Sequence, residues 1–358
     1  MRMSANPTSL AVSSFAAFNA VDFTRRLIDI ESITYNECAV GQFLAEFLHS
    51  RGFAVETTPV AQDRESQCQG ERFNVYACNA GETPDVVFST HMDTVPPFIP
   101  SSEDADYIYG RGACDAKGII AAQIAAAESL RDSGVKAGLL FVVGEERDSA
   151  GAKVANLNPR GSRFFINGEP TDNRIALASK GTLRAEIRAT GRMAHSAYPE
   201  LGESATNKLI EALHRILALQ LPVDPEVGPS TLNIGLIEGG RAPNIIADHA
   251  SAQLMIRLVG PSEATRAVIE AACAGLASVD YLLEIPFMKF RHIEGISSMV
   301  AAFTTDVPWL SAWGEPLLLG PGSIHVAHTP HERLAKRELF QAIELYAKVA
   351  HRLVGGQA

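Results

Sequence analysis

The chain has 358 residues, of which 46% are hydrophobic and 20% are charged, and its formal net charge at pH 7 is −10. This length exceeds that of a typical single core and predicts two domains, while the composition is that of an ordinary folded globular protein. The negative charge argues against nucleic acid and against an anionic membrane surface as partners, which leaves small molecules and metal cations.

The cysteines and the N-terminal segment give further limits. Five cysteines without CxxC spacing predict neither a disulfide framework nor a thiolate zinc site, and they favour a reducing cytoplasm. Residues 1–18 loosely resemble a signal peptide, but the start is weakly basic and two serines interrupt the apolar run, so we interpret them as a ragged extension. No later stretch approaches the roughly 20 apolar residues of a transmembrane helix.

Helical and strand patterns alternate in the first part of the chain. Apolar residues at helical spacing predict helices at 23–30 and 38–49, and strands are expected at 53–60 and 74–78. The apolar, β-branched run at 86–90 is typical of a buried strand of a parallel sheet. An Ala-rich helix at 119–130 and a second buried strand at 139–143 follow.

Polar side chains recur where the predicted strands end or a helix begins. Because the carboxyl ends of parallel strands meet at one edge of a sheet, these side chains are expected to lie together where ligands bind. One alone would more often cap a turn, and the recurrence is what favours a site. The segment GRGACDAKG matches neither phosphate-loop pattern, so nucleotide binding is not expected. The residues are His91, Asp93, Asp115, Glu145, Glu146 and Glu169.

From Ser179 the pattern changes to strands with one exposed face, at 182–189, 232–237 and 250–259, and helices at 205–219 and 264–277. This indicates an inserted α+β domain, after which a strand at 315–319 and a helix at 335–353 resume the first domain. The predicted fold class is therefore α/β: a catalytic domain with a mostly parallel sheet and helices on both faces, interrupted by an α+β insertion.

The late segment GPGSIHVAHTPHERL holds His325, His328 and His331, which favours metal chemistry. One metal ion could use His91, Asp115 and Glu169. A second could use Asp115, Glu146 and one of the late histidines. Imidazole and carboxylate ligands without thiolate suit Zn²⁺, with Co²⁺ or Mn²⁺ also possible. Glu145 would remain free to take a proton from a bridging water, and such a site hydrolyses amides.

Seven motifs together resemble those of the aminoacylase-related metallohydrolases, closest to the acetylornithine deacetylase and succinyl-diaminopimelate desuccinylase branch. They run in the family's order from about Val21 to the C-terminal region. The motifs are STHMDTVP, GRGACDAKG, GEE, NGEPT, AHSAYP, IEGGRAPNIIAD and GPGSIHVAHTPHE.

The resemblance implies a role for each candidate residue. His328 is preferred over His325 because the family's histidine lies four residues before a glutamate, here Glu332. A lid and dimerisation domain at 179–288 would divide a catalytic domain at 1–178 and 289–358 and join a homodimer. A cis peptide is expected after Asp115. The implied metal ligands are His91, Asp115, Glu146, Glu169 and His328. The implied catalytic residues are Glu145, Asp93 and His195, of which His195 belongs to the lid and would act on the oxyanion in the partner's site. Asn244 and Arg257 are implied to face the substrate.

The implied activity is hydrolysis of an N-acyl amino acid, with N-acetylornithine deacetylase of arginine biosynthesis as the leading interpretation. The alternatives are a succinyl-diaminopimelate desuccinylase-like enzyme and a dipeptidase or carboxypeptidase. A catalytically silent metal-binding module would require a missing ligand or base, and none is missing. Two positions depart from the pattern of many members: Gly144 and Met255 each replace an aspartate.

Overall fold

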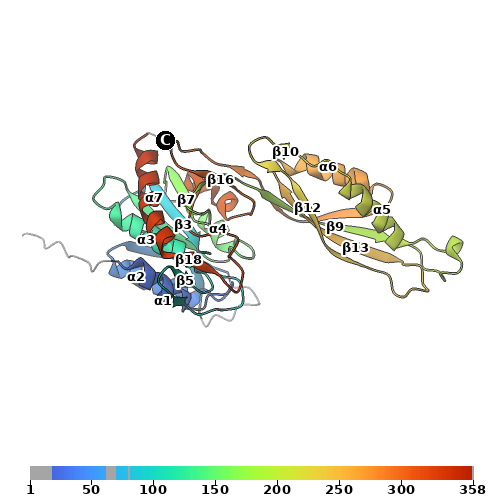
Figure 1. Ribbon diagram of the computed structural model, residues 1–358, viewed down its shortest axis with the longest axis horizontal. Helices are drawn as coiled ribbons and strands as arrows, with labels where there is room; N and C mark the ends of the chain where they lie inside the picture. The colour runs from blue at the N-terminus through green and yellow to red at the C-terminus, as the bar shows by residue number, and fades with distance from the viewer. Residues whose placement is uncertain (1–17, 62–69, 80, 357–358) are drawn as a thin grey trace, which may run out of the picture.

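The computed structural model describes residues 18–61, 70–79 and 81–356 and has two parts, a catalytic domain and an elongated lid that extends from it (Figure 1). We interpret residues 1–18 as an extension, and all of them except Phe18 lie outside the described residues. Over the described ranges, no helix combines the length and apolar character needed to cross a membrane.

A six-stranded sheet forms the centre of the catalytic domain. Four neighbouring strands are parallel, whereas β1 and β2 pair antiparallel at one edge, as expected for a mostly parallel sheet. In spatial order the strands are β1 (Ala54–Val60), β2 (Arg72–Cys78), β6 (Ala137–Val142), β3 (Val86–His91), β7 (Phe164–Asn167) and β17 (Glu315–Leu318).

Helices cover both faces of this sheet because alternate strand residues point to opposite sides. Val86 and Phe88 join the larger core, whereas Val87 between them joins the smaller core on the other face. The larger core includes residues of α1 (Ala20–Ile28), α2 (Cys38–Ser50), α3 (Lys117–Ser129) and α7 (Lys336–Val354); the smaller includes residues of α4 (Ala150–Ala155) and the 3-10 segment η2 (Val307–Trp313).

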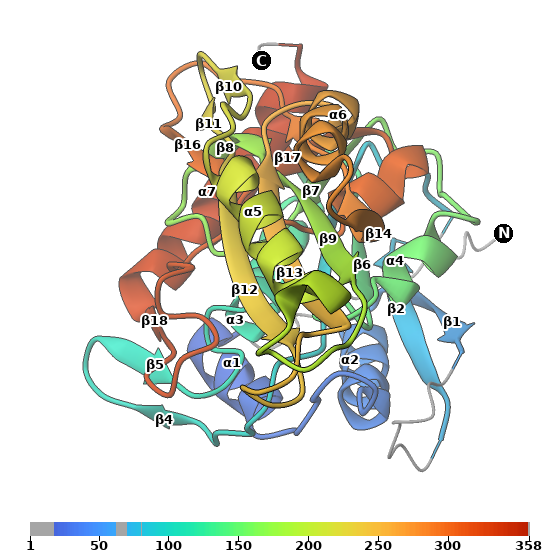
Figure 2. The same ribbon diagram turned by 90° about the vertical axis from the view of Figure 1, so that its right-hand side faces the viewer.

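The lid is an antiparallel sheet with its helices on one face (Figures 1 and 2). Small and apolar residues at every second strand position pack beneath these helices, so the intervening residues form an open face. The strands in spatial order are β12 (Thr231–Gly239), β13 (His249–Leu258), β9 (Gly181–Thr190) and β14 (Ser278–Ile285), and the helices are α5 (Ala205–Leu217) and α6 (Ser262–Cys273).

Short elements complete the chain. Two three-stranded sheets have the orders β15-β8-β16 and β18-β5-β4, and a hairpin joins β10 to β11. Their bounds are β4 (Ser102–Glu103), β5 (Tyr107–Tyr109), β8 (Ile175–Ser179), β10 (Val223–Asp224), β11 (Gly228–Pro229), β15 (Met288–Lys289), β16 (Ser298–Ala301) and β18 (Arg333–Ala335), with the 3-10 turn η1 at Pro199–Leu201.

This architecture confirms the predicted α/β class with an inserted α+β domain; the limits at 178 and 288 stay predictions. The helix expected to reach residue 277 ends at Cys273. Strand β14 follows and was not predicted, because a bulge between Tyr281 and Leu283 disturbs its alternation.

The cysteines correct a second expectation. Cys38 is disulfide-bonded, whereas Cys78, Cys114 and Cys273 are free. Spacing along the chain did not reveal this bond, because the fold and not the sequence separation decides which thiols meet. A cytoplasmic location stays a prediction.

Candidate metal centre

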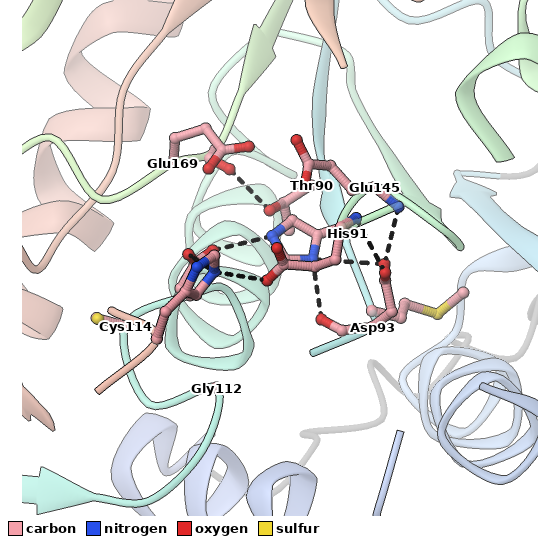
Figure 3. Close-up of polar contacts among 12 residues, drawn as sticks. Thr90, His91, Asp93, Gly112, Cys114, Glu145 and Glu169 are labelled. Carbon is pink, nitrogen blue, oxygen red and sulfur yellow. Dashed lines mark hydrogen bonds and ion pairs between the residues drawn. The ribbon is translucent and has the colours of Figure 1, made fainter. Parts of the chain in front are cut away.

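His91 lies at the carboxyl end of β3, between Asp93 and Asp115, and is 1% exposed (Figure 3). Its Nδ1 is 2.9 Å from the backbone oxygen of Asp93, and its Nε2 is 3.0 Å from Oδ1 of Asp115. Because a carbonyl oxygen only accepts, the proton of a neutral imidazole belongs on Nδ1. Nε2 is then free to ligate a metal ion, and the carbonyl oxygen that accepts from Nδ1 holds the imidazole in this tautomer.

The Asp115 loop is fixed by Glu332, a buried residue. Its carboxylate accepts hydrogen bonds from the backbone N–H groups of Gly112 at 2.9 Å, Cys114 at 3.3 Å and Asp115 at 3.2 Å. It also accepts one from Nη1 of Arg111 at 2.6 Å. The histidine-to-glutamate spacing was the available signal for this role. The predicted cis peptide between Asp115 and Ala116 is confirmed.

Asp93 connects the end of β3 to the turn that carries the two glutamates. Its carboxylate accepts the backbone N–H of Glu145 at 3.1 Å and that of Glu146 at 3.2 Å (Figure 3). The hydroxyl of Thr34 donates to the same carboxylate at 2.9 Å. In this geometry Asp93 therefore positions both His91 and the glutamate turn.

Gly144 begins that turn in a backbone conformation that favours glycine, with φ +82°. A Cβ at this position would lie 2.6 Å from Nη2 of Arg72 and 2.9 Å from Oδ1 of Asp148. Arg72 is buried and forms an ion pair with Glu37 at 3.0 Å. The guanidinium group thus occupies space that a side chain at position 144 would need.

Two groups of potential ligands share Asp115. His91, Asp115 and Glu169 form one group, and Asp115, Glu146 and His328 form the other; within each, the donor atoms lie within 4.8 Å of one another. His328 Nε2 is 2.9 Å from Oε1 of Glu146 and 3.4 Å from Oδ2 of Asp115. Bonds of about 2.0–2.2 Å from each donor to a central Zn²⁺ are compatible with these separations.

The electrostatics also fit bound cations. Burial raises the pKa of Glu145 and Glu169 well above the usual value, and the charges of Glu169 and Asp115, respectively, add to the effect. The carboxylates of Asp115 and Glu146 raise the pKa of His328 to about 10. Clustered carboxylates that resist ionisation together become stable as anions when positive ions lie between them. The donors and their charges therefore suit two divalent ions.

Of the late histidines, only His328 belongs to a donor group; the structure places His325 and His331 in exposed positions outside both groups. We expect His328→Ala to lower the metal content from two ions to one per chain, because few other donors are available at that ion. Metal analysis after exhaustive dialysis measures this.

His328 has φ 61°, a conformation that asparagine also tolerates, so His328→Asn separates backbone effects from the lost imidazole. His325→Ala and His331→Ala are the matched controls and should retain both ions. Metal loss in the His325 variant instead would contradict this assignment.

A cavity of about 600 Å³ lies over the donor groups and is lined by both domains. Arg257 lines it from the lid, as expected for a residue that faces substrate. His195 and Asn244 are exposed and lie next to each other, since the Ser196 N–H donates to the Asn244 carbonyl. The segments that hold them lie at the end of the lid farthest from the catalytic domain (Figure 1).

Strand β9 gives the scale of this separation. Arg257 pairs with Thr182, whereas His249 pairs with Thr190 at the other end of the strand, toward His195. Eight residues of strand span about 26 Å. The structure therefore does not bring His195 and Asn244 to the site of their own chain.

The potential ligands share one carboxylate and lie at the carboxyl edge of an α/β sheet beneath a cavity, which is the arrangement of a metal centre open to a small molecule. Residues 177–279 match the family model described as a peptidase dimerisation domain. A probable carboxypeptidase of Aspergillus terreus is 38% identical over 95% of this chain and 89% of its own. A peptidase M20 domain-containing protein of Schizosaccharomyces pombe is also 38% identical, over 93% and 84%.

A tripeptidase from Staphylococcus aureus has the same fold, with a TM-score of 0.77 at 22% identity, and the match covers 93% of this chain and 98% of that one. The Aspergillus terreus and Schizosaccharomyces pombe relatives match over most of both chains, which shows the family. The chain belongs to the M20 peptidases and is a metallopeptidase-type hydrolase with a dimerisation domain.

Proposed function

We propose that the protein is a metal-dependent carboxypeptidase that hydrolyses the amide bond before a C-terminal amino acid. The observation that carries the proposal is the cavity, which joins the shared-carboxylate donor groups to the cationic side chain of Arg257. The relatives named probable carboxypeptidases favour this alternative over N-acetylornithine deacetylase. An N-acyl amino acid presents the same amide and terminal carboxylate, so the acyl group is the difference between the two activities.

Each donor group would hold one divalent ion, with Asp115 shared; zinc fits the donors, and cobalt is the alternative. Such ions supply Lewis acidity that activates water and polarises the scissile carbonyl. His91 is oriented for this by Asp93, and Asp115 by Glu332. The ligand geometry is therefore maintained by hydrogen bonds that do not themselves involve the ions.

Glu145 is the proposed proton carrier. It lines the cavity but belongs to neither donor group, and Asp93 fixes its backbone. Burial and the charge of Glu169 raise the pKa of its carboxyl group above the usual value for a glutamate. It would take the proton from the attacking water and deliver it to the leaving amine.

Arg257 is the proposed site for the substrate's terminal carboxylate. Its Nη1 donates to the hydroxyl of Thr182 at 2.5 Å, and among the described residues no carboxylate pairs with it. A guanidinium group left with open donors in a cavity suits a bidentate carboxylate ligand.

We also propose that the lid forms a homodimer that brings His195 and Asn244 to the partner's site. The lid exposes large apolar side chains on α5, where Ile210 and Leu217 are each 65% exposed, and on edge strand β12, where Ile237 is 63% exposed. Such residues and an unpaired strand edge are typical of a surface that another chain covers. His195 would then donate to the oxyanion of the tetrahedral intermediate.

The proposed function is tested by the release of free amino acid from benzoylglycyl-amino acids by the zinc- or cobalt-loaded enzyme. We expect release from substrates with a free C-terminal carboxylate and loss of activity after chelation, with recovery when metal is restored. The C-terminal amide of the same substrate is the matched control and should be cleaved at least about 100-fold more slowly, because Arg257 loses its charged partner. Equal cleavage of the amide would contradict a carboxypeptidase.

A further inference from the structure

We propose that the lid side of the cavity selects a leaving amino acid with an uncharged, apolar side chain, which packs against Met255, Leu283 and Ile285. This inference rests on the proposed function, because Arg257 is taken to hold the terminal carboxylate of the same residue. It adds the substrate class, which the family does not specify.

The three apolar side chains lie around Arg257 because of the register of the lid sheet. Met255 precedes Arg257 by two residues on β13, so both point to the open face, away from α5 and α6. Ile285 lies in the same row as Arg257, with Thr182 between them. Leu283 lies in the row of Met255. Two strand spacings, about 10 Å, separate the members of a row, and Thr182 and Arg184 of β9 lie between them, so the substrate side chain would lie over this open face of the sheet.

These side chains offer apolar surface that the chain itself does not cover. All three line the cavity, and Leu283 is 44% exposed. A substrate side chain that contacts them removes apolar surface from water on both partners, which stabilises the complex. Met255 is unbranched and adapts to different apolar shapes, so leucine, methionine and phenylalanine are all suitable.

The charges on this face disfavour a cationic leaving residue. Arg257 and Arg184 are the cations nearest to Met255 in the sheet register, and Arg184 is already bonded to the side-chain oxygen of Gln253 at 2.6 Å. The carboxylates that line the cavity all come from the catalytic domain, in the metal centre and at Asp148. An ornithine ammonium group on the lid side would lie near guanidinium groups without an opposite charge.

Met255 is central because it lies two residues before Arg257 on the same face of β13 and lines the cavity. A carboxylate there could neutralise the ammonium group of a basic leaving residue, whereas a thioether cannot. The thioether of Met255 provides a cavity wall without charge beside Arg257. An aspartate at position 255 would therefore change the preferred side chain while leaving the metal centre and the carboxylate site in place.

The test compares kcat/KM for benzoylglycyl-leucine, -methionine, -ornithine and -glutamate. We expect leucine and methionine to exceed ornithine and glutamate by about 10- to 100-fold, as expected for burying one apolar side chain. Met255→Asp should lower kcat/KM for leucine about 10-fold or more and raise it for ornithine. Leu282→Asp is the matched control: this neighbour on β14 is 45% exposed but does not line the cavity, so the preference should not change.

A binding measurement keeps this inference separate from the proposed function. Calorimetry with metal-loaded Glu145→Gln should show at least about 10-fold tighter binding of benzoylglycyl-leucine than of the ornithine compound, whether or not wild-type enzyme cleaves either. Equal or tighter binding of the ornithine or glutamate compound overturns the inference even if the enzyme is a carboxypeptidase. Absence of cleavage with the expected binding order overturns only the proposed function.

Discussion

Glu145→Gln is expected to lower kcat by about 10²- to 10⁴-fold while both metal ions remain bound. The substitution removes a proton acceptor that belongs to neither donor group. Glutamine is nearly isosteric, and the backbone of residue 145 stays bonded to Asp93. Metal content, substrate KM and kcat should be measured on the same preparation, since the loss is expected in kcat with little change in KM.

Glu344→Gln is a suitable control, because Glu344 is exposed on α7, and it should leave kcat unchanged. The pH dependence adds a second readout. A general base must be deprotonated, so the acidic limb of the wild-type kcat profile should fall as pH decreases and should be lost in the variant's residual activity. A Glu145→Gln enzyme with near-normal kcat would remove this residue from the proposed chemistry.

His195→Ala is expected to lower kcat by about 10²- to 10³-fold, the usual effect of removing one oxyanion donor. The segment that holds His195 lies at the end of the lid farthest from the catalytic domain, so this loss would come from the partner's site. His292→Ala, at an exposed position in the catalytic domain, is the control and should be fully active.

Subunit exchange tests the origin of His195 directly. A heterodimer of Glu145→Gln and His195→Ala chains has one intact site if His195 acts across the interface, because one site combines the unmodified Glu145 with the partner's unmodified His195. An equal mixture should recover about one quarter of wild-type activity, since half of the dimers are mixed. Exchange demonstrated by mass spectrometry without any recovery would show that His195 does not act in the partner's site.

The site residues that lie at strand ends could be predicted from the sequence. His91, Glu145 and Glu169 each follow a short apolar run, and parallel strands bring such positions together whatever the loop lengths between them. Asp115 follows no such run and was placed by the helix that begins just after it, whereas the choice of His328 among the late histidines depended on the family resemblance. Their convergence in the structure reflects long-range contacts that local patterns do not contain.

Glu332 illustrates those contacts. Its carboxylate accepts a hydrogen bond from the backbone N–H of Gly112, which lies 220 residues earlier in the chain. No periodicity links the two segments, so only the fold could show the bond. Strand β14 was missed for a local reason, because the bulge after Tyr281 interrupts the alternation that identifies a half-exposed strand. The same strand supplies Leu283 and Ile285 to the cavity.

The position of Arg72 beside Gly144 restricts which side chains position 144 can hold. An aspartate at 144 would bring its Cβ to within 2.6 Å of Nη2 of Arg72, in a backbone conformation that already disfavours a side chain. Replacing Arg72 alone would leave the buried carboxylate of Glu37 without its ion-pair partner. The three positions are therefore coupled in this chain: an aspartate at 144 is expected to require a shift or replacement of Arg72, and a change at Arg72 alone is expected to lower stability through the unpaired Glu37.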